Sequence, residues 1–170
     1  MSVTVFRIWR NKKLPYTQSP HLTSEEIESL LKKALVARFC SLNADGTIHA
    51  VPVWYRYLEG KIVVATPVAS RKARNVKRNE NVTLLIDDSE TRGVWPKGVV
   101  VYGKAKLDVS NLAMEEFTHL CEKYFPGDRA ESYARGLLGL TKWVKIVVIP
   151  MHMASFDYTN DEAYKTATGE

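Results

Sequence analysis

The sequence contains few cysteines, since only Cys40 and Cys121 occur among its 170 residues. Each stands in an apolar periodic segment, with no CxxC pair and no histidine at the spacing of metal ligands. A disulfide framework and a cysteine-based metal site are therefore excluded, and we expect two buried thiols. We predict no metal site elsewhere in the chain either.

Long hydrophobic runs are also missing. A membrane helix needs roughly 20 apolar residues, whereas the apolar run 146–149 stops at Pro150. The first residues, MSVTVFRIWRNKK, contain no apolar run long enough for a secretory signal. We therefore expect a soluble, cytoplasmic protein without a membrane partner.

Short catalytic motifs are absent as well. The patterns GxSxG, HExxH, GxGxxG and GxxxxGK[ST] do not occur. The four histidines have no carboxylate or cysteine partner at motif spacing: His21, His49, His119 and His152. The residues alone therefore assign no catalytic side chain.

What is present is the composition of one globular domain. Hydrophobic residues make up 45% and charged residues 25%, which excludes a disordered or low-complexity chain. We divide the sequence into an N-terminal arm (1–22), one domain (23–158) and a polar C-terminal tail (159–170). Neither a repeat nor a linker interrupts the central part.

Positive charge is concentrated in one place. The net charge is +5, and an equal excess lies in eight residues that include no acid: Arg71, Lys72, Arg74, Lys77 and Arg78. A nucleic-acid-binding surface usually spreads over a wider face. The tight cluster therefore favours one small anion over nucleic acid as the ligand.

The hydrophobic pattern predicts mainly strands. Thr23 and Glu26 form the capping box of a first helix, with Leu22 and Ile27 as its hydrophobic staple. Two more helices are predicted around 113–124 and 130–138. Strands are predicted over 36–42, 47–57, 61–66, 82–87, 99–107 and 142–158. This order indicates an antiparallel β-barrel covered by a few helices rather than a parallel doubly wound sheet.

Two segments conflict with a purely structural barrel. Ser70 is a suitable N-cap for a short helix to about Arg78, yet Arg71 and Lys72 would then oppose its dipole. An anion bound there reverses that effect, and phosphate fits better than carboxylate because it offers more acceptor oxygens. A solvated basic helix face is the alternative interpretation.

The second segment is the strand 47–57. Pro52 cannot donate a ladder hydrogen bond, so this strand must have an edge or a bulge where a flat ligand could reach the backbone. Trp54, Tyr55 and Tyr57 crowd the same strand, where a ring system could stack on them. A plain edge strand with ordinary aromatic packing is the alternative.

Several stretches resemble the pyridoxamine 5′-phosphate oxidase-like proteins, which bind FMN on a split β-barrel. They are ARFCSL (37–42), Asp45-Gly46, HAVPVWY (49–55), the segment 63–75 followed by VTLLID (82–87), VYGKA (101–105), and 147–157 around Pro150. The resemblance covers roughly residues 23–158. It implies a homodimer with FMN in grooves at the subunit interface, acting on a small-molecule substrate.

The resemblance also implies the cofactor-binding residues. Ser70, Arg71 and Lys72 match the positions that hold the FMN phosphate, and Ala65 and Thr66 match the strand end beside it. The strand whose backbone lines the isoalloxazine edge corresponds to His49, Val51, Pro52, Val53 and Trp54.

The chain departs from the vitamin B6 oxidases at two places. Its end, DYTNDEAY (157–164), lacks the arginine and histidine that grip the vitamin phosphate there, and position 49 is His where those enzymes carry arginine. We therefore expect an FMN-dependent oxidoreductase that acts on a different substrate from the vitamin B6 oxidases. The alternatives are a deazaflavin-dependent reductase of the same fold, with added cations from Arg7, Arg10, Lys12 and Lys13, or a non-enzymatic flavin-binding protein.

Overall fold

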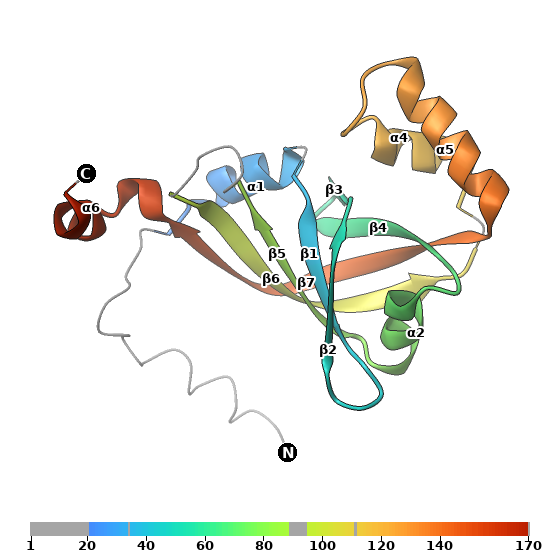
Figure 1. The fold of residues 1–170 in the computed structure, drawn as a ribbon, viewed down its shortest axis with the longest axis horizontal. Helices are drawn as coiled ribbons and strands as arrows, with labels where there is room; N and C mark the ends of the chain where they lie inside the picture. The colour runs from blue at the N-terminus through green and yellow to red at the C-terminus, as the bar shows by residue number, and fades with distance from the viewer. Residues whose placement is uncertain (1–20, 34, 89–94, 111, 170) are drawn as a thin grey trace.

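The computed structural model describes residues 21–33, 35–88, 95–110 and 112–169. Most of the predicted arm 1–22 lies outside these ranges. The elements follow one another as α1 (Ser24–Lys32), β1 (Ala37–Leu42), β2 (Ile48–Val53), β3 (Arg56–Leu58), β4 (Lys61–Pro67), α2 (Arg71–Arg78), β5 (Asn81–Asp87), β6 (Lys97–Asp108), α4 (Met114–Cys121), α5 (Asp128–Leu140), β7 (Trp143–Asp157) and α6 (Glu162–Thr168). Figure 1 shows their arrangement.

One curled antiparallel sheet organises the molecule. Its seven strands run in the order β2-β1-β5-β6-β7-β4-β3, so β2 and β3 are its two edges. Only Trp54 and Tyr55 separate these edge strands in the chain. The edges must therefore lie close together, and the sheet curls into an incompletely closed barrel (Figure 1). The predicted fold class, an antiparallel split barrel with helices, is confirmed.

Alternation along the strands builds the barrel interior. In β1, β5 and β6 every second residue is buried, and Phe39, Leu84 and Val101 are fully enclosed. Leu30 and Leu31 of α1 close the same core. Their helix begins at the predicted cap, where the Thr23 hydroxyl accepts from the Glu26 backbone N–H and the Glu26 carboxylate accepts from that of Thr23.

The strand predicted over 47–57 is broken in the structure. It ends at Val53 and resumes at Arg56, because the chain crosses there from one edge of the sheet to the other. Pro52 lies on the edge strand β2, opposite Arg38. The expectation of an edge at this proline is confirmed, since an edge strand tolerates a missing donor.

A bulge bends the long strands β6 and β7. Tyr102 pairs with His152 but Gly103 pairs with Pro150, which leaves Met151 as the extra residue. A side chain at position 103 could not be accommodated, because a Cβ there would lie 2.9 Å from the Ile149 carbonyl oxygen. The bulge and the glycine together allow the sheet to curl.

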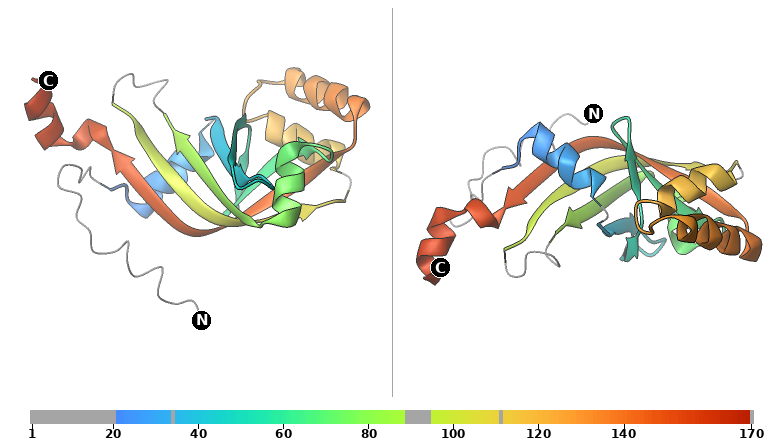
Figure 2. Two further views of the ribbon diagram at one scale, coloured as in Figure 1. Left: turned by 60° about the horizontal axis from the view of Figure 1, so that its bottom comes forward. Right: turned by 90° about the horizontal axis from the view of Figure 1, so that it is seen from above.

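Helices α4 and α5 form a hairpin at one end of the sheet, drawn in orange in Figure 2. They build a second apolar cluster around Phe117, Leu120 and Ala134, separate from the barrel core. The Tyr124 hydroxyl fastens this hairpin to the barrel: it accepts from the Tyr55 N–H at 3.0 Å and donates to the Leu35 carbonyl at 2.9 Å. The hairpin position is therefore fixed against the β2–β3 crossing.

The segment after β7 is partly helical. Tyr158–Asn160 forms a 3-10 turn on the Asp157 side chain, and α6 follows. These residues lie at the end of the sheet opposite α4 and α5 (Figure 1). Within the described residues, no helix combines the length and apolarity required to cross a membrane.

Candidate functional site

The start of α2 has the predicted cap. Ser70 precedes the helix, and its hydroxyl oxygen accepts from the Ala73 N–H at 3.3 Å and from the Thr66 hydroxyl at 2.9 Å. Because the oxygen accepts both bonds, the hydroxyl hydrogen of Ser70 is still available to donate. No acidic residue lies in the first turn of α2.

Two residues of the first turn of α2, Arg71 and Lys72, are positively charged. Hydrogen bonds from Thr47, and then the charge of Arg71, lower the pKa of the Asp45 carboxyl on the β1–β2 turn, so Arg71 has one acidic group nearby. Within the described residues, neither Arg71 nor Lys72 forms a hydrogen bond or an ion pair with another side chain. Lys72 is half-buried, and desolvation lowers its pKa. His49 on β2 lies near both: its pKa is lowered by desolvation and then by the charges of Arg71 and Lys72. The start of α2 therefore carries two positive charges that no ion pair within the described residues neutralises.

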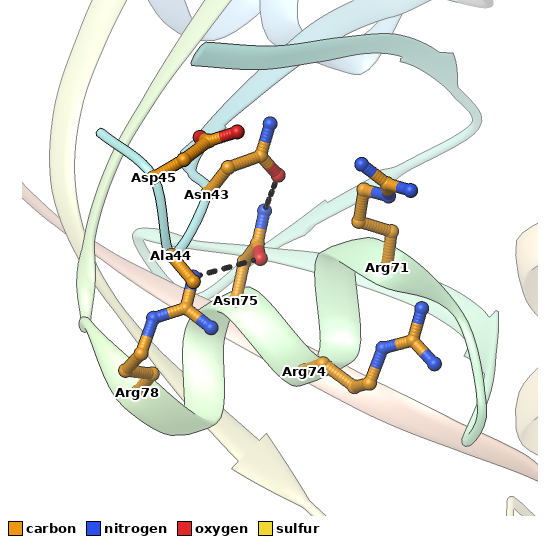
Figure 3. Close-up of a pocket in the computed structure, with 7 residues that line it drawn as sticks. All are labelled: Asn43, Ala44, Asp45, Arg71, Arg74, Asn75 and Arg78. Carbon is orange, nitrogen blue, oxygen red and sulfur yellow. Dashed lines mark hydrogen bonds between the residues drawn. The ribbon is translucent and has the colours of Figure 1, made fainter. Parts of the chain in front are cut away.

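A polar cavity of about 260 Å³ opens on one side of α2 (Figure 3). Arginines from the helix line it together with the β1–β2 turn: Asn43, Ala44, Asp45, Arg71, Arg74, Asn75 and Arg78. Buried Asn75 joins helix to turn, because its amide nitrogen donates to the Ser41 hydroxyl and to the Asn43 side-chain carbonyl. Arg78 is held by Asn75 and by the Leu42 carbonyl, whereas Arg71 and Arg74 extend freely.

A second cavity, of about 170 Å³, lies on the other side of α2. Residues of β2, the β2–β3 crossing, β4 and α2 form one wall: Pro52, Val53, Trp54, Ala65, Pro67 and Lys72. Lys72 is the only charged residue among them. This wall brings together five of the residues that the resemblance assigns to the flavin site.

Helices α4 and α5 and the start of β7 form the opposite wall of this cavity. Its residues are apolar or aromatic: Phe117, Leu120, Tyr133, Leu137 and Trp143. The Trp54 ring closes one side, since it stacks on Tyr124 with ring centroids 4.7 Å apart and contacts Tyr133 at 5.3 Å. Trp143 is fixed by a hydrogen bond from its indole N–H to the Leu137 carbonyl at 2.9 Å.

The structure places the ten sequence-predicted residues in five different settings. Pro52, Val53, Trp54, Ala65 and Lys72 line the second cavity, and Arg71 lines the first. Ser70 and buried Thr66 bond to each other between the cavities. His49 lies near the two cations, and Val51 packs against the barrel core.

Arg71 and Lys72, which the resemblance assigns to one phosphate, line different cavities. Successive helical residues point about 100° apart, so neighbouring cations line different cavities. Sequence reasoning also missed Asn43, Asn75 and the α4–α5 wall. No sequence pattern marked Asn75. The sequence showed that Trp54, Trp143 and Phe117 belong to an aromatic-rich chain, but not that they line one cavity.

The comparisons with known proteins identify the family. The model of the pyridoxamine 5′-phosphate oxidase family matches residues 23–141, and the chain belongs to this family. Comparison with curated protein sequences gives no match.

Solved structures share the fold. A conserved hypothetical protein from Mycobacterium tuberculosis is 21% identical, with a TM-score of 0.70 over 84% of this chain and 89% of that one. An F420 reductase is 20% identical, with a TM-score of 0.59 over 77% and 98%. A FAD-binding protein from Mesorhizobium loti is 18% identical, with a TM-score of 0.59 over 83% and 99%.

Proposed function

We propose that this protein is an FMN-binding oxidoreductase whose flavin phosphate sits at the start of α2. The observation that carries this proposal is a pair of cations, Arg71 and Lys72, that form no ion pair with any described residue and lie beside a helix N-terminus capped by Ser70. Backbone N–H groups of a first helical turn point toward such a ligand. The flavin supplies redox chemistry, while the chain supplies binding and orientation.

The residues present fit a phosphate monoester. Ser70 can donate its remaining hydroxyl hydrogen, Arg71 offers a planar fork, and Lys72 offers a point charge. The phosphate would be held at the start of α2 by Arg71 and Lys72, each of which lines one of the two cavities. Its charge would also remove the repulsion among Arg71, Lys72 and the dipole of α2.

The edge strand β2 is the proposed support for the flavin ring. One of its sides pairs with β1, and the other side is unpaired in the sheet order. Backbone groups near Val51 and Val53 are therefore accessible to the edge of a flat ring, and Pro52 contributes no N–H there. We assign no acid–base residue to catalysis.

We propose that the flavin site is completed by a second copy of the chain. The outward face of β6 and β7 carries exposed apolar side chains, including Tyr102 (46% exposed), Met151 (64%) and Ile149 (37%). Tyr102 stacks on His152 there, with ring centroids 5.9 Å apart. An apolar surface of this kind is typical of a homodimer interface.

A deazaflavin coenzyme is the second candidate, and the polar cavity favours it. Such a cofactor has a longer, more anionic tail than FMN. Arg74 and Arg78 line the polar cavity beyond Arg71 and could hold additional negative groups. One of the proteins with the same fold is an F420 reductase.

A flavin titration with two variants tests the phosphate site. Replacing both cations (Arg71→Ala with Lys72→Ala) should weaken FMN binding by about 10- to 100-fold, because charge-assisted hydrogen bonds are lost. Riboflavin, which has no phosphate, should bind the variant and the wild type equally. Lys77→Ala, an exposed cation at the far end of α2, should leave FMN binding unchanged and serves as the control.

Unchanged FMN affinity in the double variant would contradict the proposed phosphate site. Titration of the same proteins with a deazaflavin coenzyme separates the two candidates. Tighter deazaflavin binding, lost on Arg74→Ala, would assign the polar cavity to that cofactor's tail.

A further inference from the structure

We infer that Asn75 is a positioning residue: it holds the tip of the β1–β2 hairpin against α2 and thereby sets the separation between the edge strand β2 and the cationic first turn of α2. The proposed function places the flavin ring on β2 and its phosphate at that turn, so the effect of Asn75 on the cofactor rests on the proposed function. The attachment of the hairpin follows from the hydrogen bonds alone.

Asn75 is a polar residue on the buried face of α2. It is 3% exposed, and the other buried residues of this eight-residue helix, Ala73 and Val76, are apolar. Asparagine is a weak helix former, and a buried amide lowers stability unless its groups are hydrogen-bonded. The hydrogen bonds of the amide therefore explain why this position holds asparagine rather than an apolar residue.

The amide of Asn75 joins α2 to the hairpin (Figure 3). Its nitrogen donates to the Ser41 hydroxyl at 3.1 Å and to the Asn43 side-chain carbonyl at 3.0 Å. Its oxygen accepts from Arg78 at 3.1 Å, and the same guanidinium nitrogen donates to the Leu42 carbonyl at 2.8 Å. In the described part of the chain, these two helix residues make the hydrogen bonds between α2 and the hairpin. A fully bonded buried network of this kind specifies one arrangement of its elements.

The tip of the hairpin extends beyond the sheet. β1 pairs with β5 as far as Ser41, which lies opposite Val82. The pairing of β1 with β2 continues to Leu42 and Ile48, and the turn follows. Asn75 bonds at the last residue paired with β5 and again within the turn, at Asn43. Without this amide, the tip could therefore hinge at the end of the β1–β5 pairing.

His49 lies where a movement of the tip would be detected. It pairs with Ser41 directly across the ladder, and opposed residues of antiparallel strands carry their side chains on the same face of the sheet. Since the Ser41 hydroxyl meets Asn75, the His49 side chain lies on the face that is turned toward α2. Desolvation, and then the charges of Arg71 and Lys72, lower the pKa of His49. This pKa therefore reports how closely β2 approaches the first turn of α2.

A titration of His49 without flavin tests the attachment. Asn75→Ala removes the amide without changing the charge of the chain, so the tip should move away and the pKa of His49 should rise toward its ordinary value. Asn79→Ala is the matched control, because its side chain accepts from Asn81 rather than bonding to the hairpin, and it should leave that pKa unchanged. Proton NMR follows the imidazole resonance, which His49→Gln assigns, and the other three histidines serve as internal references.

A flavin titration tests the consequence for the cofactor. A ligand with two ends gains from two supports only where both can be engaged at once. Asn75→Ala should therefore weaken FMN binding at least about tenfold and riboflavin binding by no more than about twofold. A loss of stability alone would change neither the ratio of these affinities nor the pKa of His49 in the folded protein.

If Asn75→Ala fails to fold, Asn43→Ala removes one hairpin acceptor at a half-buried position and should give both changes to a smaller degree. An unchanged His49 pKa in the folded variant, or equal losses of FMN and riboflavin affinity, would overturn the inference. A protein that binds neither flavin but shows the His49 shift would keep the attachment by Asn75 and reject the proposed flavin function. The two failures are thus distinguishable.

Discussion

At the scale of single residues, the unusual groups are cations in places that disfavour charge. Lys72 lies half-buried at the start of α2 and forms no ion pair with the part of the chain that the structure describes. Lys123 is deeper: its Nζ lies 3.4 Å from the centre of the Tyr55 ring and donates to the Leu31 and Tyr55 carbonyls. The first is proposed to meet a ligand, whereas the second links α1, the β2–β3 crossing and the end of α4.

Lys123 makes stability depend on pH. Burial lowers its pKa to about 7, while in the unfolded chain it is about 10.4. Between these values the unfolded chain binds one more proton than the native protein, so the penalty that this lysine imposes on the folded state falls as pH rises and stays constant below about pH 7. Comparison with Lys123→Met isolates this contribution.

We expect the stability of the wild type relative to Lys123→Met to increase from pH 7 to pH 9. The slope cannot exceed about 1.4 kcal/mol per pH unit for a single proton. Urea denaturation of both proteins across this range measures it. A difference in unfolding free energy that does not change with pH would show that Lys123 keeps an ordinary pKa.

At the scale of elements, local patterns were sufficient for most of the fold. The capping box at Thr23 and the cap at Ser70 begin α1 and α2 where predicted. The tight turn between β3 and β4 has positive φ at Glu59 and Gly60. These features are set by neighbouring residues, which is why the sequence alone reveals them.

Features that depend on distant contacts were not predictable. The break between β2 and β3 follows from closure of the sheet, and the cavity wall depends on where the α4–α5 hairpin docks. That docking rests on Tyr124, which bonds to Tyr55 and Leu35, 69 and 89 residues away. Helix geometry likewise places Arg71 and Lys72 beside different cavities, which the sequence pattern alone did not indicate.

Removal of the Tyr124 hydroxyl should weaken the docking of the hairpin. Tyr124→Phe leaves the Tyr55 N–H and the Leu35 carbonyl without this partner, so we expect a loss of about 1–3 kcal/mol in unfolding free energy. Thermal and urea denaturation measure the loss. Tyr133→Phe, whose ring is 40% exposed, should stay within about 0.5 kcal/mol of the wild type and controls for the substitution.

A loss below that of the Tyr133→Phe control would contradict this account of Tyr124. The hairpin would then be held by its apolar contacts with Trp54 rather than by the hydroxyl.

At the scale of the whole molecule, the residues that stabilise the fold and the candidate binding features lie in different parts of the barrel. The interior holds the fold together, while the ends and the outward face carry the cavities, the unpaired cations and the exposed apolar side chains. The fold class follows from strand patterning and is confirmed by both the structure and the family match. Assembly and substrate are properties of surfaces, which patterning does not determine.

If the proposed dimer forms, a charged substitution on the outward face of β6 and β7 should disrupt it. Tyr102→Glu places a charge in the apolar patch, so it should produce monomers in light scattering coupled to gel filtration. Val109→Glu alters a 58% exposed side chain beyond the end of β6 and should leave the assembly unchanged. A wild-type protein that is monomeric at micromolar concentration would reject the dimer.

The most direct test of the central claim compares two flavins on the unmodified protein. FMN and riboflavin share the ring and differ in the phosphate that the start of α2 is proposed to hold. In a fluorescence titration, the account predicts saturable FMN binding at one per chain, at least about tenfold tighter than riboflavin. Equal affinity for both flavins, or no binding of either, would contradict it.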